Sequence, residues 1–204
     1  QAVVRKRAQR ALRLGGLDVQ VDGDEHLPDG GYVAVYNETS WPDALAFNAT
    51  LWGAYLDRGA GAAEFGKIPF MKAASGLAGV ALVPRGDRAG VDRVLEDLSA
   101  SLRAGERVAF GGEGRMSGKD GVLRFKQGAA LLAIRAGRPL VPMAMRGGHL
   151  LLPWGTLNLS PGTVRIRFGP PLPVTGLTDD DARELADQAQ AAVTELYERL
   201  AAED

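Results

Sequence analysis

The chain has 204 residues, with 24 Lys or Arg against 25 Asp or Glu, so its formal net charge is −1. This length suits one substantial domain, and the balanced charge gives no global positive field of the kind that recruits nucleic acid. The absence of Cys excludes disulfides and thiolate metal sites and fits a cytoplasmic protein, while two His are too few for a multi-histidine metal site.

Residues 2–14 predict a basic amphipathic helix, because five cations alternate with apolar side chains until Gly15 and Gly16 end the pattern. We take residues 1–15 as this helix and 16–204 as the remaining domain. Two interpretations of the helix stay open, a solvated surface helix or a helix on an anionic membrane face. No apolar run is long enough to span a bilayer, although the first residue is Gln, so the sequence allows an upstream signal peptide or membrane helix.

The most informative stretch follows a predicted buried strand at residues 32–36, itself preceded by an alternating edge strand at residues 17–21. Ser40 and Asp43 have the spacing of a capping box, and Pro42 suits the first turn of a helix that extends towards Trp52. Polar side chains are therefore held where a strand ends and a helix begins. Such junctions often carry the reactive site of an α/β sheet.

The middle of the chain alternates between helix and strand patterns. A Gly/Ala-rich stretch at residues 53–66 gives way to a short helix ending near Gly76, and residues 79–83 predict a second buried strand that delivers Arg85 at its carboxyl end. Residues 91–102 have the spacing of a covering helix, and residues 107–110 predict a third strand.

A glycine cluster at residues 111–119 follows the third strand and fails both phosphate-binding patterns. Glu113 stands where a P-loop needs Gly, and Ser117 stands at the third Gly of the dinucleotide fingerprint. Beyond it, residues 125–134 predict an apolar, buried helix and residues 139–145 a fourth buried strand. A further strand covers residues 164–171, and the last helix begins at Thr178.

These stretches resemble, in order, the motifs of the PlsC-type glycerolipid acyltransferases. The family's first motif is Asn-His, four residues, then Asp, and here Asn37 and Asp43 match while Glu38 replaces the histidine. The third motif, Phe-Pro-Glu-Gly-Thr-Arg-Ser, is matched by Glu113, Gly114 and Ser117, with Gly111 and Gly112 in place of Phe-Pro and Arg115 displaced by one position. Val141-Pro142 resembles the fourth motif.

The resemblance implies a single α/β domain with a central, mostly parallel or mixed β-sheet flanked by helices. It also implies transfer of a fatty acyl group from acyl-CoA or acyl carrier protein to a lysophospholipid hydroxyl, with no metal or cofactor, at the cytoplasmic face of a membrane. Glu38 takes the position of the general base, and Asp43 that of the acid that orients it. The residues implied to bind substrate are Lys67, Arg85, Glu113, Gly114, Arg115 and Ser117.

Glu38 leaves alternatives open. A carboxylate is less basic than imidazole by roughly two pKa units, which would slow proton removal on the order of tenfold. We also expect the Asp43 carboxylate to lie beside Glu38. Otherwise Glu38 is inert, in a silent homologue that binds acyl lipid or a partner protein, or it is an engineered replacement. His149 is disfavoured as a substitute base because loop histidines are mostly solvated, and Ser40 lacks the surroundings of a nucleophile.

Overall fold

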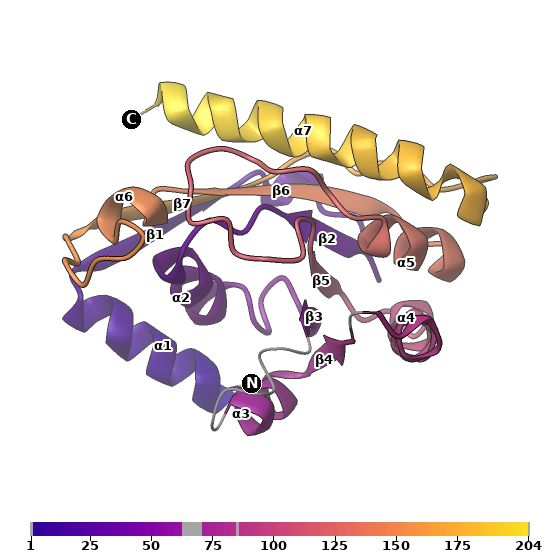
Figure 1. The fold of residues 1–204 in the computed structure, drawn as a ribbon, viewed down its shortest axis with the longest axis horizontal. Helices are drawn as coiled ribbons and strands as arrows, with labels where there is room; N and C mark the ends of the chain where they lie inside the picture. Colours follow the sequence, from indigo (N-terminus) through magenta and orange to yellow (C-terminus); the bar gives the residue numbers. More distant parts are fainter. Residues whose placement is uncertain (1, 63–70, 85, 204) are drawn as a thin grey trace.

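The computed structural model describes residues 2–62, 71–84 and 86–203, which form a seven-stranded sheet with helices on both faces (Figure 1). The strand order is β1-β7-β6-β2-β5-β3-β4. All neighbours are parallel except β6 and β7, so β1 and β7 run opposite to the other strands. The expected α/β domain with a central mixed sheet is therefore confirmed.

The bounds of the elements follow the alternation of helix and strand patterns. The strands are β1 (Leu17–Asp22), β2 (Val33–Tyr36), β3 (Arg58–Ala62), β4 (Val80–Val83), β5 (Val108–Gly111), β6 (Leu140–Arg146) and β7 (Gly162–Phe168). The helices are α1 (Ala2–Leu14), α2 (Trp41–Thr50), α3 (Met71–Ala78), α4 (Arg88–Arg103), α5 (Gly128–Ala136), α6 (Gly148–Leu151) and α7 (Ala182–Ala202). Short 3-10 helices cover Asp24–His26 and Asp179–Asp181.

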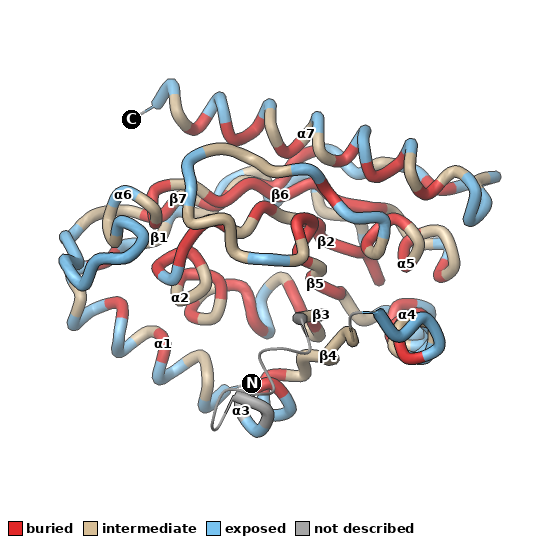
Figure 2. The backbone as a smooth tube through the Cα atoms, viewed as in Figure 1, coloured by how far each residue is buried: buried red, intermediate tan, exposed pale blue. Residues whose placement is uncertain are grey.

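Both faces of the sheet are buried, and β2 shows why. Val33 and Val35 pack into a cluster with residues of α4, α5 and α7, whereas Ala34 packs on the other face with residues of α2. Because successive side chains of a strand point to opposite faces, a strand that is apolar at every position needs a helix layer on each side. Figure 2 shows the result as a buried sheet below a buried stripe along α7.

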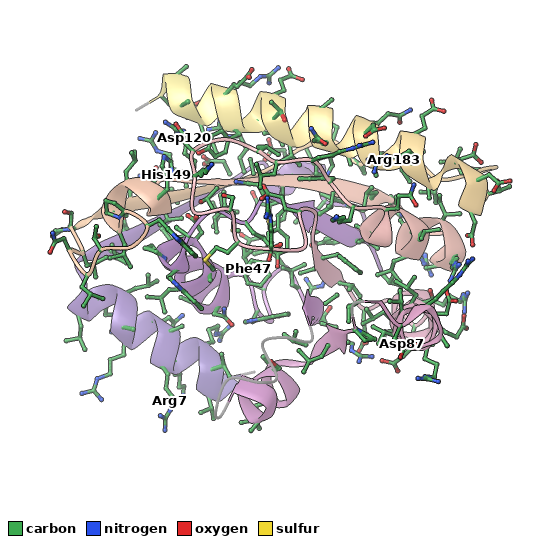
Figure 3. All side chains as sticks on the ribbon, viewed as in Figure 1. Arg7, Phe47, Asp87, Asp120, His149 and Arg183 are labelled. Atoms are coloured by element: carbon green, nitrogen blue, oxygen red, sulfur yellow. The ribbon has the colours of Figure 1, made fainter. Side chains whose placement is uncertain are left out.

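The amino-terminal helix predicted from the sequence is α1, which packs against α2. Ala8 and Leu12 share a hydrophobic cluster with Leu17 and Ala49. This packing leaves the opposite side of α1 in solvent, and Figure 3 shows Arg7 projecting away from the sheet. The exposed cations of this side are Lys6, Arg7, Arg10 and Arg13.

Two expectations about the far edge of the sheet are wrong. β4 is half-buried rather than buried, because it is the edge strand and, among the strands that the structure describes, pairs only with β3. β3 itself was not expected, since its sequence Arg-Gly-Ala-Gly-Ala lacks the β-branched residues typical of strands. The glycines serve close packing instead, because a Cβ at Gly59 would come 3.0 Å from the Trp52 ring.

Candidate active site

The candidate site lies at the sheet edge where β2, β5 and β6 end, and Asn37 joins two of these strand ends. Its side-chain Nδ2 donates to the carbonyl oxygen of Met145 at 2.9 Å, and its Oδ1 accepts from the Met145 N–H at 2.8 Å. Asn37 is fully buried. This clasp fixes the loop after β2 to the end of β6.

The loop after β5 lies along the same stretch. The N–H of Ser117 donates to the Glu38 carbonyl oxygen at 2.6 Å, and the N–H of Gly118 donates to that of Thr39 at 2.9 Å. The two stretches that resemble the first and third motifs are thus hydrogen-bonded side by side, although they are far apart in the sequence.

Asp43 is buried at the start of α2, where Ser40 is the N-cap as predicted. Its Oδ2 accepts from the Ser40 hydroxyl at 2.7 Å and from the Thr39 hydroxyl, and its Oδ1 accepts from the Gly148 N–H at 3.1 Å. Burial raises the pKa of Asp43, and these hydrogen bonds oppose the rise. The carboxylate is therefore held by its own loop and by α6.

Glu38 has an acidic neighbour that the sequence analysis did not pair with it, because its charge acts to raise the pKa of Glu113. Asp43 as a second acidic neighbour of Glu38 stays a prediction. The Glu38 carboxylate lies over Gly111, in the space that a Cβ there would need. Burial, with a smaller contribution from the nearby Glu38 charge, raises the pKa of Glu113 to about 7. The two differences from the family pattern, Glu at position 38 and Gly at position 111, therefore fit each other sterically, because the absent side chain at Gly111 leaves the space that the Glu38 carboxylate occupies.

The remaining residues of the third-motif stretch have mixed surroundings. Arg115 is exposed, and its charge acts to lower the pKa of Glu113 against the larger effect of burial. The Ser117 hydroxyl donates to the Lys119 carbonyl oxygen at 3.1 Å and accepts from the Lys119 N–H at 3.2 Å, so it closes a local turn. Gly114 adopts a positive φ of 67° in the same loop. Lys67 and Arg85 lie outside the described residues, and their roles stay predictions.

A pocket of about 370 Å³ opens beside the first-motif loop. Thr39, Ser40 and His149 give it a polar side, while its apolar lining includes Trp41, Leu152, Pro153, Trp154 and Leu157. Three of these side chains are also exposed to solvent, Trp41 by 50%, Trp154 by 60% and Leu157 by 97%. The sequence analysis did not predict this apolar lining of the pocket. Its one signal in the sequence was a group of large apolar residues in a segment with no strand or helix pattern.

The interpretation of His149 as a solvated loop residue is wrong. The residue lies on α6, and its side chain is 10% exposed. Gly147 has a positive φ of 109°, and Gly148 has no room for a Cβ between the side chains of Asp43 and Ser40. These two glycines let α6 approach the first-motif loop closely, which buries the imidazole.

A family model described as Acyltransferase matches residues 18–146, which is more than half of the chain. The chain belongs to the acyltransferase family. Among relatives, 1-acyl-sn-glycerol-3-phosphate acyltransferase alpha of Homo sapiens is 28% identical over 194 residues, covering 92% of this chain and 66% of the human protein. The 1-acyl-sn-glycerol-3-phosphate acyltransferase of Neisseria gonorrhoeae is 30% identical over 141 residues, covering 69% of this chain and 52% of that protein.

The fold of this acyltransferase-family chain matches a solved structure as well. The crystal structure of the 1-acyl-sn-glycerophosphate (LPA) acyltransferase PlsC from Thermotoga maritima superposes with a TM-score of 0.77 at 25% identity, covering 98% of this chain and 79% of that one. The chain spans about two thirds of the length of its human relative. Of the helices that the structure describes, none is both long enough and apolar enough to cross a bilayer.

Proposed function

We propose that the chain transfers a fatty acyl group from a thioester, acyl-CoA or acyl carrier protein, to the hydroxyl of lysophosphatidate. The observation that carries the proposal is the hydrogen-bonded pairing of the first-motif and third-motif loops beside a pocket with an apolar wall. The names of the relatives, 1-acyl-sn-glycerol-3-phosphate acyltransferases, support the choice of acceptor.

In this reaction the acceptor hydroxyl loses its proton while its oxygen attacks the thioester carbonyl carbon, and the carbon–sulfur bond then breaks. The apolar wall suits an acyl chain, and the polar side of the pocket suits the reacting hydroxyl. Exposed Arg115 lies in the loop that borders the site, where a guanidinium is suited to the acceptor phosphate. Nothing in this sequence of steps requires a metal or cofactor.

A membrane surface is the proposed place of action, because the acceptor is a lipid. The exposed side of α1 carries Lys6, Arg7, Arg10 and Arg13, and each cation near an anionic bilayer contributes about 1 kcal/mol of binding. Apolar Trp41, Trp154 and Leu157 around the pocket add exposed surface suited to the lipid boundary. Peripheral binding at the cytoplasmic face would bring the pocket to its acceptor.

A second candidate, a silent homologue that binds acyl lipid, is favoured by one observation. The residue in the position of the base, Glu38, lies over Gly111, and the Asp43 carboxylate is occupied by Thr39, Ser40 and Gly148. These three hydrogen bonds to the first-motif acid therefore come from groups other than residue 38. Glu38 as the base stays a prediction.

Thiol release from palmitoyl-CoA on anionic vesicles containing lysophosphatidate separates the two candidates, with palmitoyl-acyl carrier protein as a parallel donor. Turnover by the chain supports the transferase, turnover by Glu38→His alone supports the silent homologue, and turnover by neither contradicts the proposed reaction. Arg115→Gln should raise KM for lysophosphatidate roughly tenfold through the lost phosphate contact. Arg93→Gln, in an exposed side chain on α4, is the matched control.

A further inference from the structure

His149 stands beside the first-motif acid, although it comes from a distant part of the sequence. The N–H of Gly148, the residue before it, donates to Asp43 Oδ1 at 3.1 Å, and the charge of the imidazole acts to lower the pKa of Asp43. His26 is the other histidine, and it lies in the 3-10 helix after β1 with a side chain 41% exposed. His149 is thus the imidazole at the candidate site.

The imidazole is buried with its hydrogen-bonding capacity unused. Its side chain is 10% exposed, and within the described residues neither Nδ1 nor Nε2 has a hydrogen-bond partner. Leaving a buried donor and acceptor unpaired costs free energy, so such a group calls for an explanation, and a bound ligand is one. His149 also lines the pocket, together with Thr39 and Ser40.

Titratable groups from three elements lie near the ring, and a cation from a fourth contacts two of them. Asp43 of α2, Asp120 of the loop after β5 and Tyr197 of α7 are the neighbours of the ring. Arg146 of β6 binds Asp120 and lies over the Tyr197 ring. Asp120 is fixed in place, because its Oδ1 accepts from the Tyr197 hydroxyl at 2.5 Å and from Arg146 Nη1 at 3.1 Å.

His149 Nε2 lies 3.4 Å from the same Asp120 oxygen, and Figure 3 shows the two residues between α6 and α7. Two carboxyl groups therefore act on the imidazole, Asp120 at this distance and Asp43 through its charge.

We propose that His149, rather than Glu38, accepts the proton of the lysophosphatidate hydroxyl, an inference that rests on the proposed transferase function. The hydroxyl proton passes to a ring nitrogen of His149 as the oxygen attacks the thioester carbonyl carbon. Collapse of the tetrahedral intermediate breaks the carbon–sulfur bond, and the imidazolium returns the proton to the sulfur, which leaves as a free thiol. The family's pairing of imidazole with acid is thereby kept, with the imidazole supplied by α6.

Turnover of palmitoyl-CoA with lysophosphatidate in five variants tests this assignment. His149→Gln should lower kcat by roughly 10²–10⁴-fold, the usual contribution of a general base, while Glu38→Gln should lower it by less than about tenfold. The double variant Glu38→His/His149→Gln should recover turnover to the level of Glu38→His alone, which shows that the loss in His149→Gln is not a folding defect. His26→Gln is the matched control and should leave kcat unchanged.

The outcomes separate failure of this inference from failure of the transferase function. If the unaltered chain turns over and His149→Gln keeps its kcat within about threefold, far below the usual effect of a general base, His149 is not the base and the transferase function stands. If Glu38→His turns over and the unaltered chain does not, the role of His149 is overturned and a silent site is supported. No turnover by either the unaltered chain or Glu38→His overturns the transferase function, and the role of His149 with it.

Discussion

The buried carboxyl of Glu113 should make the stability of the fold depend on pH. Its pKa is raised from 4.5 to about 7, first by burial and then by the charge of Glu38. Between these two values the unfolded chain releases a proton that the folded chain keeps, so the contribution to stability is full below pH 4.5 and is lost as pH rises through 7. A difference of 2.5 units (7 − 4.5) at 1.36 kcal/mol each makes this loss about 3 kcal/mol.

Glu113→Gln removes the titrating group and keeps an oxygen that can accept from the Leu123 N–H, now 3.1 Å from Oε1. Urea unfolding followed by Trp fluorescence from pH 4.5 to 8 should show the variant gaining about 3 kcal/mol relative to the unaltered chain as pH rises. Glu198→Gln, in an exposed residue of α7, is the control and should show no such gain. Parallel stability curves for Glu113→Gln and the unaltered chain would refute the reasoning.

Three further outcomes follow from the packing around the site. Gly148→Ala should lower the free energy of unfolding by about 1–3 kcal/mol, because the added Cβ has no room beside Asp43 and Ser40. Gly76→Ala is the control and should not lower it, because a Cβ there has no neighbour within 4 Å. Equal melting temperatures for the two variants by calorimetry would contradict this. Asn37→Ala should cost about 2–4 kcal/mol in urea unfolding by leaving the buried N–H and C=O of Met145 unpaired, and an unchanged midpoint would count against the clasp. Tyr197→Phe should raise the pKa of Asp120, because the Tyr197 hydrogen bond is the main group lowering it, and NMR titration of that carboxyl would show no change if the contact is unimportant.

The parts of the fold that depend on local patterns could be predicted from the sequence. The apolar strand at residues 32–36, the Ser40 cap and the apolar helix at residues 125–134 each carry their own signal, and all three are present as β2, α2 and α5 within small shifts of their bounds. The two motif stretches could also be expected at one edge, because the carboxyl ends of parallel strands meet there.

Features that depend on long-range packing could not be predicted. β3 forms because Gly59 and Gly61 allow close contact with Trp52 and Val80, and no local propensity marks it as a strand. His149 is buried because Gly148 fits against Asp43, which lies 105 positions earlier in the sequence. The direction of the Glu38 side chain likewise depends on the missing side chain at Gly111, which belongs to a different strand.

The antiparallel pairing of β6 with β7 determines which part of the chain can vary in length next to the pocket. Because β7 returns against β6, the connection between them, residues 147–161, emerges at the same edge as the motif loops and supplies much of the pocket wall. Insertions or deletions there would alter the size and hydrophobicity of the pocket while the register of the sheet stays the same. Under the proposed function, a change in this one connection would alter the preferred acyl-chain length independently of the reacting groups.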